Sequence, residues 1–132
     1  MSTLNVANIQ SLTTSTLPVV KNSAGTEVGQ FARAWALLDG TGTASRTGNF
    51  NVSAITDNGT GHYTLTFATA LPNANYCAVA SGCLNNSGDT SITSIFMFDF
   101  TTTTIKLKTF RLQSNTATPR DFEQISVAIF GD

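Results

Sequence analysis

Hydrophobic and polar residues alternate in two short stretches near the middle of the chain, residues 50–54 and 62–67. A period of two places every second side chain on one face, which is typical of strands with one buried face. Between the stretches, Asn58-Gly59 supplies residues that tolerate the positive φ of a chain reversal. The pattern therefore predicts a β-hairpin with a loop at 56–61, ending before Pro72, because proline cannot donate to a strand ladder.

Residues 31–38 are predicted to form the strand before this hairpin. The aromatic, arginine and leucine side chains fall on one face and three alanines on the other, where a second layer can approach closely. A helix is rejected because Gly29 and the sequence DGTGT bound a run of only eight residues.

Four further strands complete the predicted set: residues 76–82, 92–100, 105–112 and 122–130. A turn at 101–104 would join the second and third of these as a hairpin, with Lys106 and Lys108 facing outward. Six to eight short strands with Gly and Asn turns and no helical periodicity predict an all-β protein. The expected architecture is an antiparallel β-sandwich of jelly-roll-like or related topology.

The most apolar of these strands is 92–100. Its even-numbered residues include Ile92, Phe96, Phe98 and Phe100, and its other face carries Ile95 and Met97. Both faces therefore need cover. Either the strand lies centrally between two layers, or its second face meets another subunit.

Residues 1–30 differ from the rest of the chain because they contain scattered aliphatic residues and no aromatic residue. That is too little apolar surface for a core of their own, so we expect an extended arm that docks on a neighbour, with a small hairpin around residues 22–25. The domain organisation is then an arm at 1–30 and a sandwich at 31–132. The candidate attachment residues of the arm are Leu4, Val6, Ile9 and Leu12.

Charge is scarce: 11% of the residues are charged, against about 25% in typical domains, and the formal net charge is −1. Lys and Arg form no run, which excludes an electrostatic footprint for nucleic acid. The first ten residues lack the basic start and apolar run of a signal peptide, and no segment is long enough to cross a membrane.

The residues that could carry chemistry form no recognised motif. Cys77 and Cys83 fit neither a redox nor a zinc pattern; on one strand they would lie about 20 Å apart, so we expect buried free thiols. Ser53, Asp57 and His62 lack a hydrolase motif, and His62 is expected to be an exposed residue at a strand start. The acids Asp39, Asp57, Asp89 and Asp99 make no calcium-loop pattern. We therefore expect no catalytic residue, cofactor or metal, and no enzyme activity.

Five segments resemble a module repeated in bacteriophage virion proteins, chiefly tail-fibre and short-fibre proteins of phages that infect cyanobacteria and other marine bacteria. They are FARAWALLDGTGT, the Asn-Val-Ser strand, DNGTG before Tyr-Thr, LPNANY and the closing VAIFGD, which follow one another between residues 31 and 132. The resemblance implies a virion structural protein, assembled in the host cytoplasm. Such a protein would be a small homotrimeric fibre, or a capsid or tail decoration subunit, held to other virion proteins by its arm.

The alternative function is a receptor-binding tail-fibre knob that contacts a host surface glycan or protein. The longest polar loops would be 81–90 and 114–121, and loops after alternate strands fall at one end of a sandwich. Their candidate contact residues are Asn85, Asn86, Asp89, Asn115 and Arg120. Neither loop contains an aromatic residue to stack on a sugar, and ordinary solvated loops are the competing interpretation. A polysaccharide-degrading enzyme is the weakest hypothesis, because no pair of candidate carboxylates is evident.

Overall fold

The structure is a computed structural model of the chain, and it describes residues 18, 20–85 and 92–131. The chain divides into two compact units, Met1–Phe31 and Ala32–Asp132. The proposed attachment residues Leu4, Val6, Ile9 and Leu12 lie outside the described residues.

The first unit contains a small antiparallel hairpin of β1 (Val20–Lys21) and β2 (Glu27–Gly29). The Asn22 side-chain oxygen accepts hydrogen bonds from the backbone N–H groups of Ala24 and Thr26, each at 3.0 Å. Asparagine caps turns in this way because its side chain imitates a backbone carbonyl. The hairpin predicted around residues 22–25 is confirmed.

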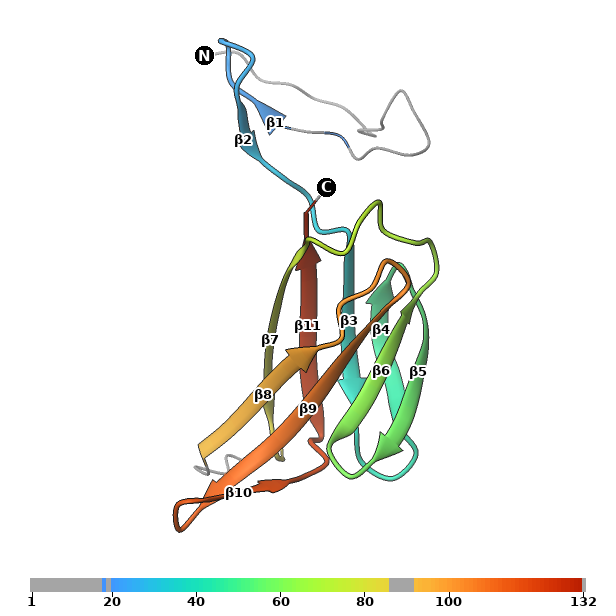
Figure 1. Ribbon diagram of the computed structural model, residues 1–132, viewed down its shortest axis with the longest axis vertical. Helices are drawn as coiled ribbons and strands as arrows, with labels where there is room; N and C mark the ends of the chain where they lie inside the picture. Colours follow the sequence, from blue (N-terminus) through green and yellow to red (C-terminus); the bar gives the residue numbers. More distant parts are fainter. Residues whose placement is uncertain (1–17, 19, 86–91, 132) are drawn as a thin grey trace. The chain divides into compact units, whose positions relative to one another are not determined.

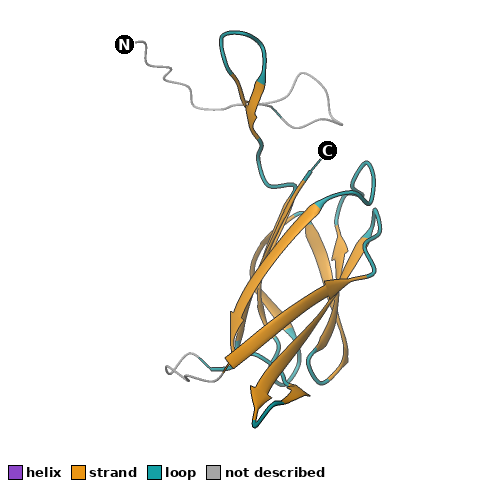
Figure 2. Cartoon of the chain, turned by 60° about the vertical axis from the view of Figure 1, so that its left-hand side comes forward, coloured by secondary structure: helices purple, strands orange, loops and turns teal. Residues whose placement is uncertain are grey.

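The second unit is an antiparallel β-sandwich of two sheets, as the alternation predicted (Figures 1 and 2). One sheet has the order β4-β3-β11-β7, formed by β3 (Ala34–Asp39), β4 (Ser45–Phe50), β7 (Cys77–Cys83) and β11 (Gln124–Phe130). The other has the order β10-β9-β6-β5 with β8 also paired to β9, formed by β5 (Val52–Gly59), β6 (His62–Phe67), β8 (Ile92–Phe98), β9 (Thr104–Gln113) and β10 (Thr116–Pro119).

Alternate residues of both sheets meet in one hydrophobic core. The odd-numbered residues of β6, and those of β9 as far as Thr109, are buried, and the alanines of β3 face the core as predicted. Fully burying one large side chain such as Leu or Ile stabilises a fold by about 1.5–3 kcal/mol. The largest fully buried side chains are Tyr63, Phe122, Leu38, Leu65, Ile105, Leu107, Ile125 and Ile129.

The chain changes sheet at Asn51, which corrects the expectation of one continuous strand through residues 50–54. Phe50 ends β4 in one sheet and Val52 begins β5 in the other, while Asn51 adopts a positive φ of 54°. The Asn51 amide holds this crossing by accepting from the Thr69 N–H at 2.7 Å and donating to the carbonyl of Arg33 at 3.1 Å. A register shift follows Val52, so Ala54 is exposed instead of sharing the buried face.

Two predicted loops are shorter than expected. Strand β5 continues to Gly59, which pairs with His62, so the first hairpin turns at residues 60–61. The expected loop at 114–120 is a two-residue turn followed by β10. Ser114 and Asn115 both have positive φ, 50° and 61°, the signature of a type I′ turn.

Strand β8 is an edge strand, which excludes the first of the two alternatives, a strand that lies centrally between two layers. Among the described residues it pairs only with β9, and Asp99, at φ 54°, takes Phe100 off the strand. Ile95 and Met97 pack against the core, whereas Ile92 and Phe96 are 65% and 59% exposed. The second face of β8 is therefore an outer surface.

The buried Tyr63 hydroxyl and its partner Asp121 link three connections at one end of the sandwich: the β3–β4 turn, the β5–β6 turn and the β10–β11 connection. The Tyr63 hydroxyl lies 2.7 Å from Asp121 Oδ1 and 3.1 Å from the Gly40 carbonyl, and the same carboxylate oxygen accepts from the Gly61 N–H at 2.6 Å. Burial, followed by the hydrogen bond to Asp121, raises the pKa of Tyr63 above its ordinary value of 10.0. Ionising this side chain therefore opposes folding.

The raised pKa of Tyr63 predicts a loss of stability at alkaline pH. A group whose folded pKa is raised stabilises the fold below its unfolded pKa, and this stabilisation is lost as the pH rises above about 10. We expect the free energy of unfolding to fall between pH values of about 9 and 11.5, with a shallower slope in Tyr63→Phe. Urea unfolding across this range measures both slopes, and identical slopes would contradict the assignment.

The close contacts around Gly61 predict an asymmetric response to two alanine substitutions. Gly61 and Gly42 have nearly the same φ, 62° and 59°, but a Cβ at Gly61 would lie 2.6 Å from the Thr109 carbonyl oxygen, whereas one at Gly42 meets nothing within 4 Å. Gly42→Ala should cost about 1 kcal/mol of unfolding free energy from backbone strain, and Gly61→Ala about 2–3 kcal/mol more from overpacking. Equal costs in denaturant titrations would show that the contact relaxes freely.

Candidate functional site

The outer face of the five-stranded sheet carries a shallow apolar depression of about 450 Å³, which we call the β8–β9 depression. It is lined by Ser94, Phe96 and Phe98 of β8 and by Lys108 and Phe110 of β9. The antiparallel register places Phe96 opposite Lys108 and Ser94 opposite Phe110. Because alternate residues of paired strands project to the same side, these five side chains gather on one surface.

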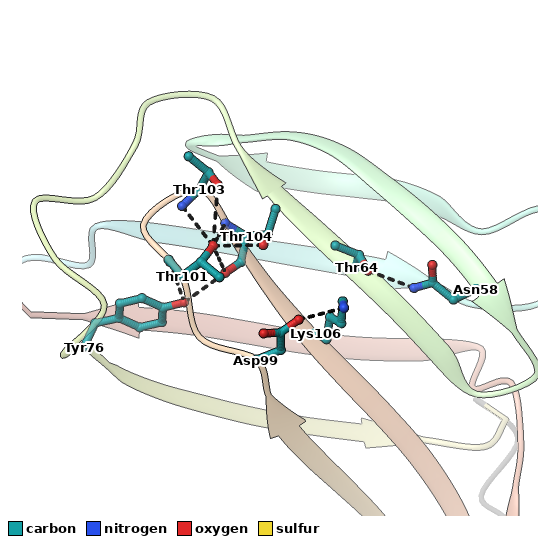
Figure 3. Close-up of polar contacts among 8 residues, drawn as sticks. All are labelled: Asn58, Thr64, Tyr76, Asp99, Thr101, Thr103, Thr104 and Lys106. Atoms are coloured by element: carbon teal, nitrogen blue, oxygen red, sulfur yellow. Dashed lines mark hydrogen bonds and ion pairs between the residues drawn. The ribbon is translucent and has the colours of Figure 1, made fainter.

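The turn between β8 and β9 supports this register (Figure 3). The Thr101 hydroxyl oxygen accepts the backbone N–H of Thr104 at 2.9 Å, and the Tyr76 hydroxyl donates to the Thr101 carbonyl at 3.2 Å. Side chains that bond to the backbone in this way stabilise turns. The hairpin predicted around residues 101–104 is confirmed, and it brings the phenyl rings of β8 beside Lys108.

Phe96 and Phe98 form a paired aromatic surface. Their ring centroids are 5.9 Å apart with an interplanar angle of 21°. The Lys108 ammonium lies 5.4 Å from the centroid of Phe98, within the range of a cation–π contact. The depression thus combines flat apolar rings with one cation.

His62 lies next to these rings and is half-buried, which corrects the expectation of an exposed residue. Its ring centroid is 5.7 Å from that of Phe98, and it pairs across the strands with Lys108. Its Nε2 atom is buried and has no hydrogen-bond partner among the described residues. Leaving such a group unsatisfied costs about 1–3 kcal/mol, and buried polar groups without a partner are rare in native structures.

A second, more polar hollow of about 250 Å³ adjoins the β8–β9 depression and shares Lys108 and Phe110 with it. The β5–β6 turn forms its wall; the lining residues are Asn58, Gly59, Thr60, Gly61, His62, Lys108, Phe110 and Pro119. The two concavities therefore make one strip that changes from apolar to polar across Phe110.

The two outward lysines of β9 differ in their neighbours. The Lys106 ammonium is 2.7 Å from the Asp99 carboxylate, an ion pair drawn in Figure 3. Lys108 contacts the Phe98 ring, and no carboxylate of the described chain forms an ion pair with it. The strip therefore keeps one positive charge that the described side chains leave unneutralised.

The imagined hydrolase triad is not assembled. The Ser53 hydroxyl bonds to the carbonyl of Thr66 at 3.2 Å, at the opposite end of the β5–β6 hairpin from His62. Asp57 accepts the Gly59 N–H at 2.8 Å within its own turn. The hairpin register keeps Ser53 away from the other two.

The acidic residues do not gather into a metal site. Asp39 accepts the Thr41 hydroxyl at 2.6 Å and the Thr41 N–H at 2.8 Å, and these bonds lower the pKa of its carboxyl. Asp99 pairs with Lys106, and Asp89 lies outside the described residues. Within the described ranges, no three His, Cys, Asp or Glu side chains could hold a metal together.

Three of the five candidate receptor residues, Asn85, Asn115 and Arg120, are among the described residues. Asn86 and Asp89 lie outside the described residues, and Asn115 lies in the β9–β10 turn. Because β8 starts where β9 ends, Asn85 and Asn115 belong to connections at the same end of the sheet. Arg120 follows β10, which runs back from the turn, and its N–H donates to the Thr109 carbonyl beside Gly61.

The outer face of the four-stranded sheet carries a second apolar surface, which we call the Trp35 row. Strand register aligns Phe50, Trp35, Ala128 and Val79 across all four strands. Phe50, Trp35 and Val79 are 49%, 43% and 51% exposed. The row contains no charged residue and crosses the full width of the sheet.

Cys77 shares this outward side of β7 with Val79. Both cysteines are free, but Cys77 is exposed and Cys83 is partly buried. The expectation of two buried thiols is therefore wrong for Cys77, because β7 turns its odd-numbered residues away from the core.

The candidate surfaces lie on strands and not in the loops where receptor contacts were expected. The signal was present in the exposed even-numbered phenylalanines of residues 92–98 and in Phe110, but their meeting depends on the β8–β9 register. The two polar loops contain no aromatic residue, so the loops alone gave no indication of these aromatic surfaces.

No family model, curated protein or solved structure matches the chain. Across the described ranges, the chain has no helix with the length and hydropathy that crossing a membrane requires.

Proposed function

We propose that this protein is a bacteriophage virion structural protein, a small homotrimeric fibre or a capsid or tail decoration subunit. The observation that carries the proposal is the Trp35 row, a flat, uncharged and exposed apolar surface across a whole sheet. Its support from the sequence is the resemblance to phage fibre modules over residues 31–132. Residues 1–30 then attach the subunit to the particle.

The Trp35 row has the character of a contact between subunits. Exposed aromatic clusters without charge are enriched at the centres of protein interfaces, and Trp is among the residues that contribute most there. Trp35 is also held in place, since its ring packs over the backbone of Gly48, where an added Cβ would lie 3.4 Å from the ring. A preformed side chain loses little entropy on association.

A second copy of the chain is the natural partner of this surface. Closed cyclic symmetry brings the same surface of each subunit towards a common axis and leaves none exposed, whereas an open contact would polymerise. The low charge of the chain, 11% of its residues, also favours burial of such a face over its solvation.

The second candidate function is recognition of a host surface receptor. It is favoured by the strip on the opposite sheet, which combines Phe96, Phe98, the Lys108 ammonium and the unpartnered Nε2 of His62. Rigid strands hold these groups, which suits binding without large rearrangement. The two functions use different faces and are compatible in one protein.

The first test concerns self-association. Light scattering should give three times the monomer mass at micromolar concentration, and Trp35→Glu should shift the protein to monomer, because burying an unpaired carboxylate in an apolar contact is costly. Phe96→Glu is the matched control, because it places the same charge at an exposed aromatic position of the other sheet. A monomeric wild type, or a Phe96→Glu variant that also dissociates, would refute the role of the Trp35 row.

The second test concerns attachment to the particle. Tagged full-length protein supplied during infection should be found on purified virions by immunogold labelling. A variant lacking residues 1–30 should keep its β-sheet circular dichroism and be absent from the particles, because the arm contributes little to the core. Equal labelling by both forms would contradict attachment through the arm, and labelling by neither would contradict the virion role.

A further inference from the structure

We propose that the β8–β9 depression and the adjoining polar hollow form a binding site for an acidic carbohydrate, a pyranose unit that carries a carboxylate. This inference rests on the second candidate function, receptor recognition, and names the chemical class of the receptor. It is independent of the subunit contact proposed for the Trp35 row.

The dimensions suit a short oligosaccharide. The apolar depression holds about 450 Å³ and the polar hollow about 250 Å³, and ligand sites for small molecules usually hold about 300–1,000 Å³. Both concavities are lined by Lys108 and Phe110, so neighbouring sugar units can occupy them without a break.

The aromatic surface suits the apolar face of a pyranose ring. Phe96 and Phe98 are stacked with an angle of 21° between their ring planes and form one aromatic pair. Phe96 is 59% exposed, so its ring is accessible in the subunit. A sugar ring that stacks there buries its C–H groups on the rings and leaves its hydroxyls at the rim, where Ser94 lies.

The charge of the site selects an acid over a neutral sugar. Lys106 is already neutralised by Asp99 at 2.7 Å, whereas Lys108 contacts only the Phe98 ring among the described interactions. A carboxylate on the ligand would complete a charge-assisted hydrogen bond with Lys108, which is worth about twice a neutral one. Nucleic acid is disfavoured, because affinity for a phosphate backbone needs several cations and this strip has one lysine.

His62 provides an independent observation that points to a ligand. The residue lines the polar hollow and its ring centroid lies 5.7 Å from that of Phe98, while its buried Nε2 has no partner among the described residues. A sugar hydroxyl can donate to or accept from an imidazole nitrogen, so a ligand in this hollow that reaches the ring would satisfy it. The side chain of Asn58 is fixed at the far wall, since its amide donates to the Thr64 hydroxyl at 2.8 Å (Figure 3).

The test uses the full-length chain and two probes of the same length, trigalacturonate and the neutral galactose trisaccharide. Isothermal titration and NMR shift mapping should detect trigalacturonate, with shifts in β8, β9 and the β5–β6 turn. Lys108→Met should weaken it tenfold or more, the scale expected for loss of a charge-assisted hydrogen bond, while Lys106→Met, the matched control on the same strand, should change affinity less than about twofold. Phe96→Ala should weaken binding, and Phe50→Ala on the other sheet should not.

The outcomes separate the sugar class from the receptor role when binding of labelled protein to host cells is measured alongside. If Phe96→Ala abolishes cell binding but the wild-type protein has no affinity for trigalacturonate, an acidic sugar is excluded as the ligand and receptor recognition is retained. Cell binding that Phe96→Ala does not change overturns both. Dissociation of the assembly by Phe96→Ala would instead identify this face as a subunit contact and overturn the site. If Lys106→Met and Lys108→Met weaken binding equally, the probe binds by unspecific charge attraction, and the proposed site is also refuted.

Discussion

The sandwich depends on the buried contact among Tyr63, Asp121 and Gly61. One carboxylate oxygen accepts from both the Tyr63 hydroxyl and the Gly61 N–H, and the Gly61 carbonyl accepts from the N–H of Thr109. These bonds fix where β6 starts relative to β9, and a one-residue slip would move every side chain to the opposite face. The same constraint therefore sets the core and places His62 opposite Lys108 on the outer surface. Core and candidate site are not independent features of this fold.

Sequence alternation predicted most strands of the sandwich, but not β4 or β10 and not the arrangement of the strands. The buried sets of β6, β9 and β11 follow a strict period of two, so their faces were predictable. The crossing at Asn51 was not, because a polar residue between Phe50 and Val52 preserves the alternation while its positive φ sends the two into different sheets. Strand β4, SRTGNF, has too few apolar residues to show a pattern, and strand order depends on contacts between residues far apart in the chain.

The candidate surfaces illustrate a second limit. A receptor site was expected in the loops because loops carry recognition in many sandwiches. Here the aromatic groups belong to strands, and which of them become neighbours is a property of register, such as Phe96 opposite Lys108 or Trp35 opposite Phe50. The sequence did indicate an unusual surface, since the even-numbered residues of 92–98 were too apolar for an ordinary solvated face. It could not tell whether that face was a core, an interface or a site.

The two outer faces differ in a way that bears on how each can be used. The Trp35 row has no charge, and its only side-chain hydrogen-bonding group is the Trp35 indole N–H, so a permanent partner can cover it at little desolvation cost. The strip across β8 and β9 includes an ammonium over a ring and a buried imidazole nitrogen without a partner, and an apolar partner would leave both unsatisfied. A polar ligand that brings its own carboxylate and hydroxyls fits that face better. The positions of the few polar groups thus make one outer face apolar and the other partly polar, and this difference supports the proposal that the first serves assembly and the second recognition.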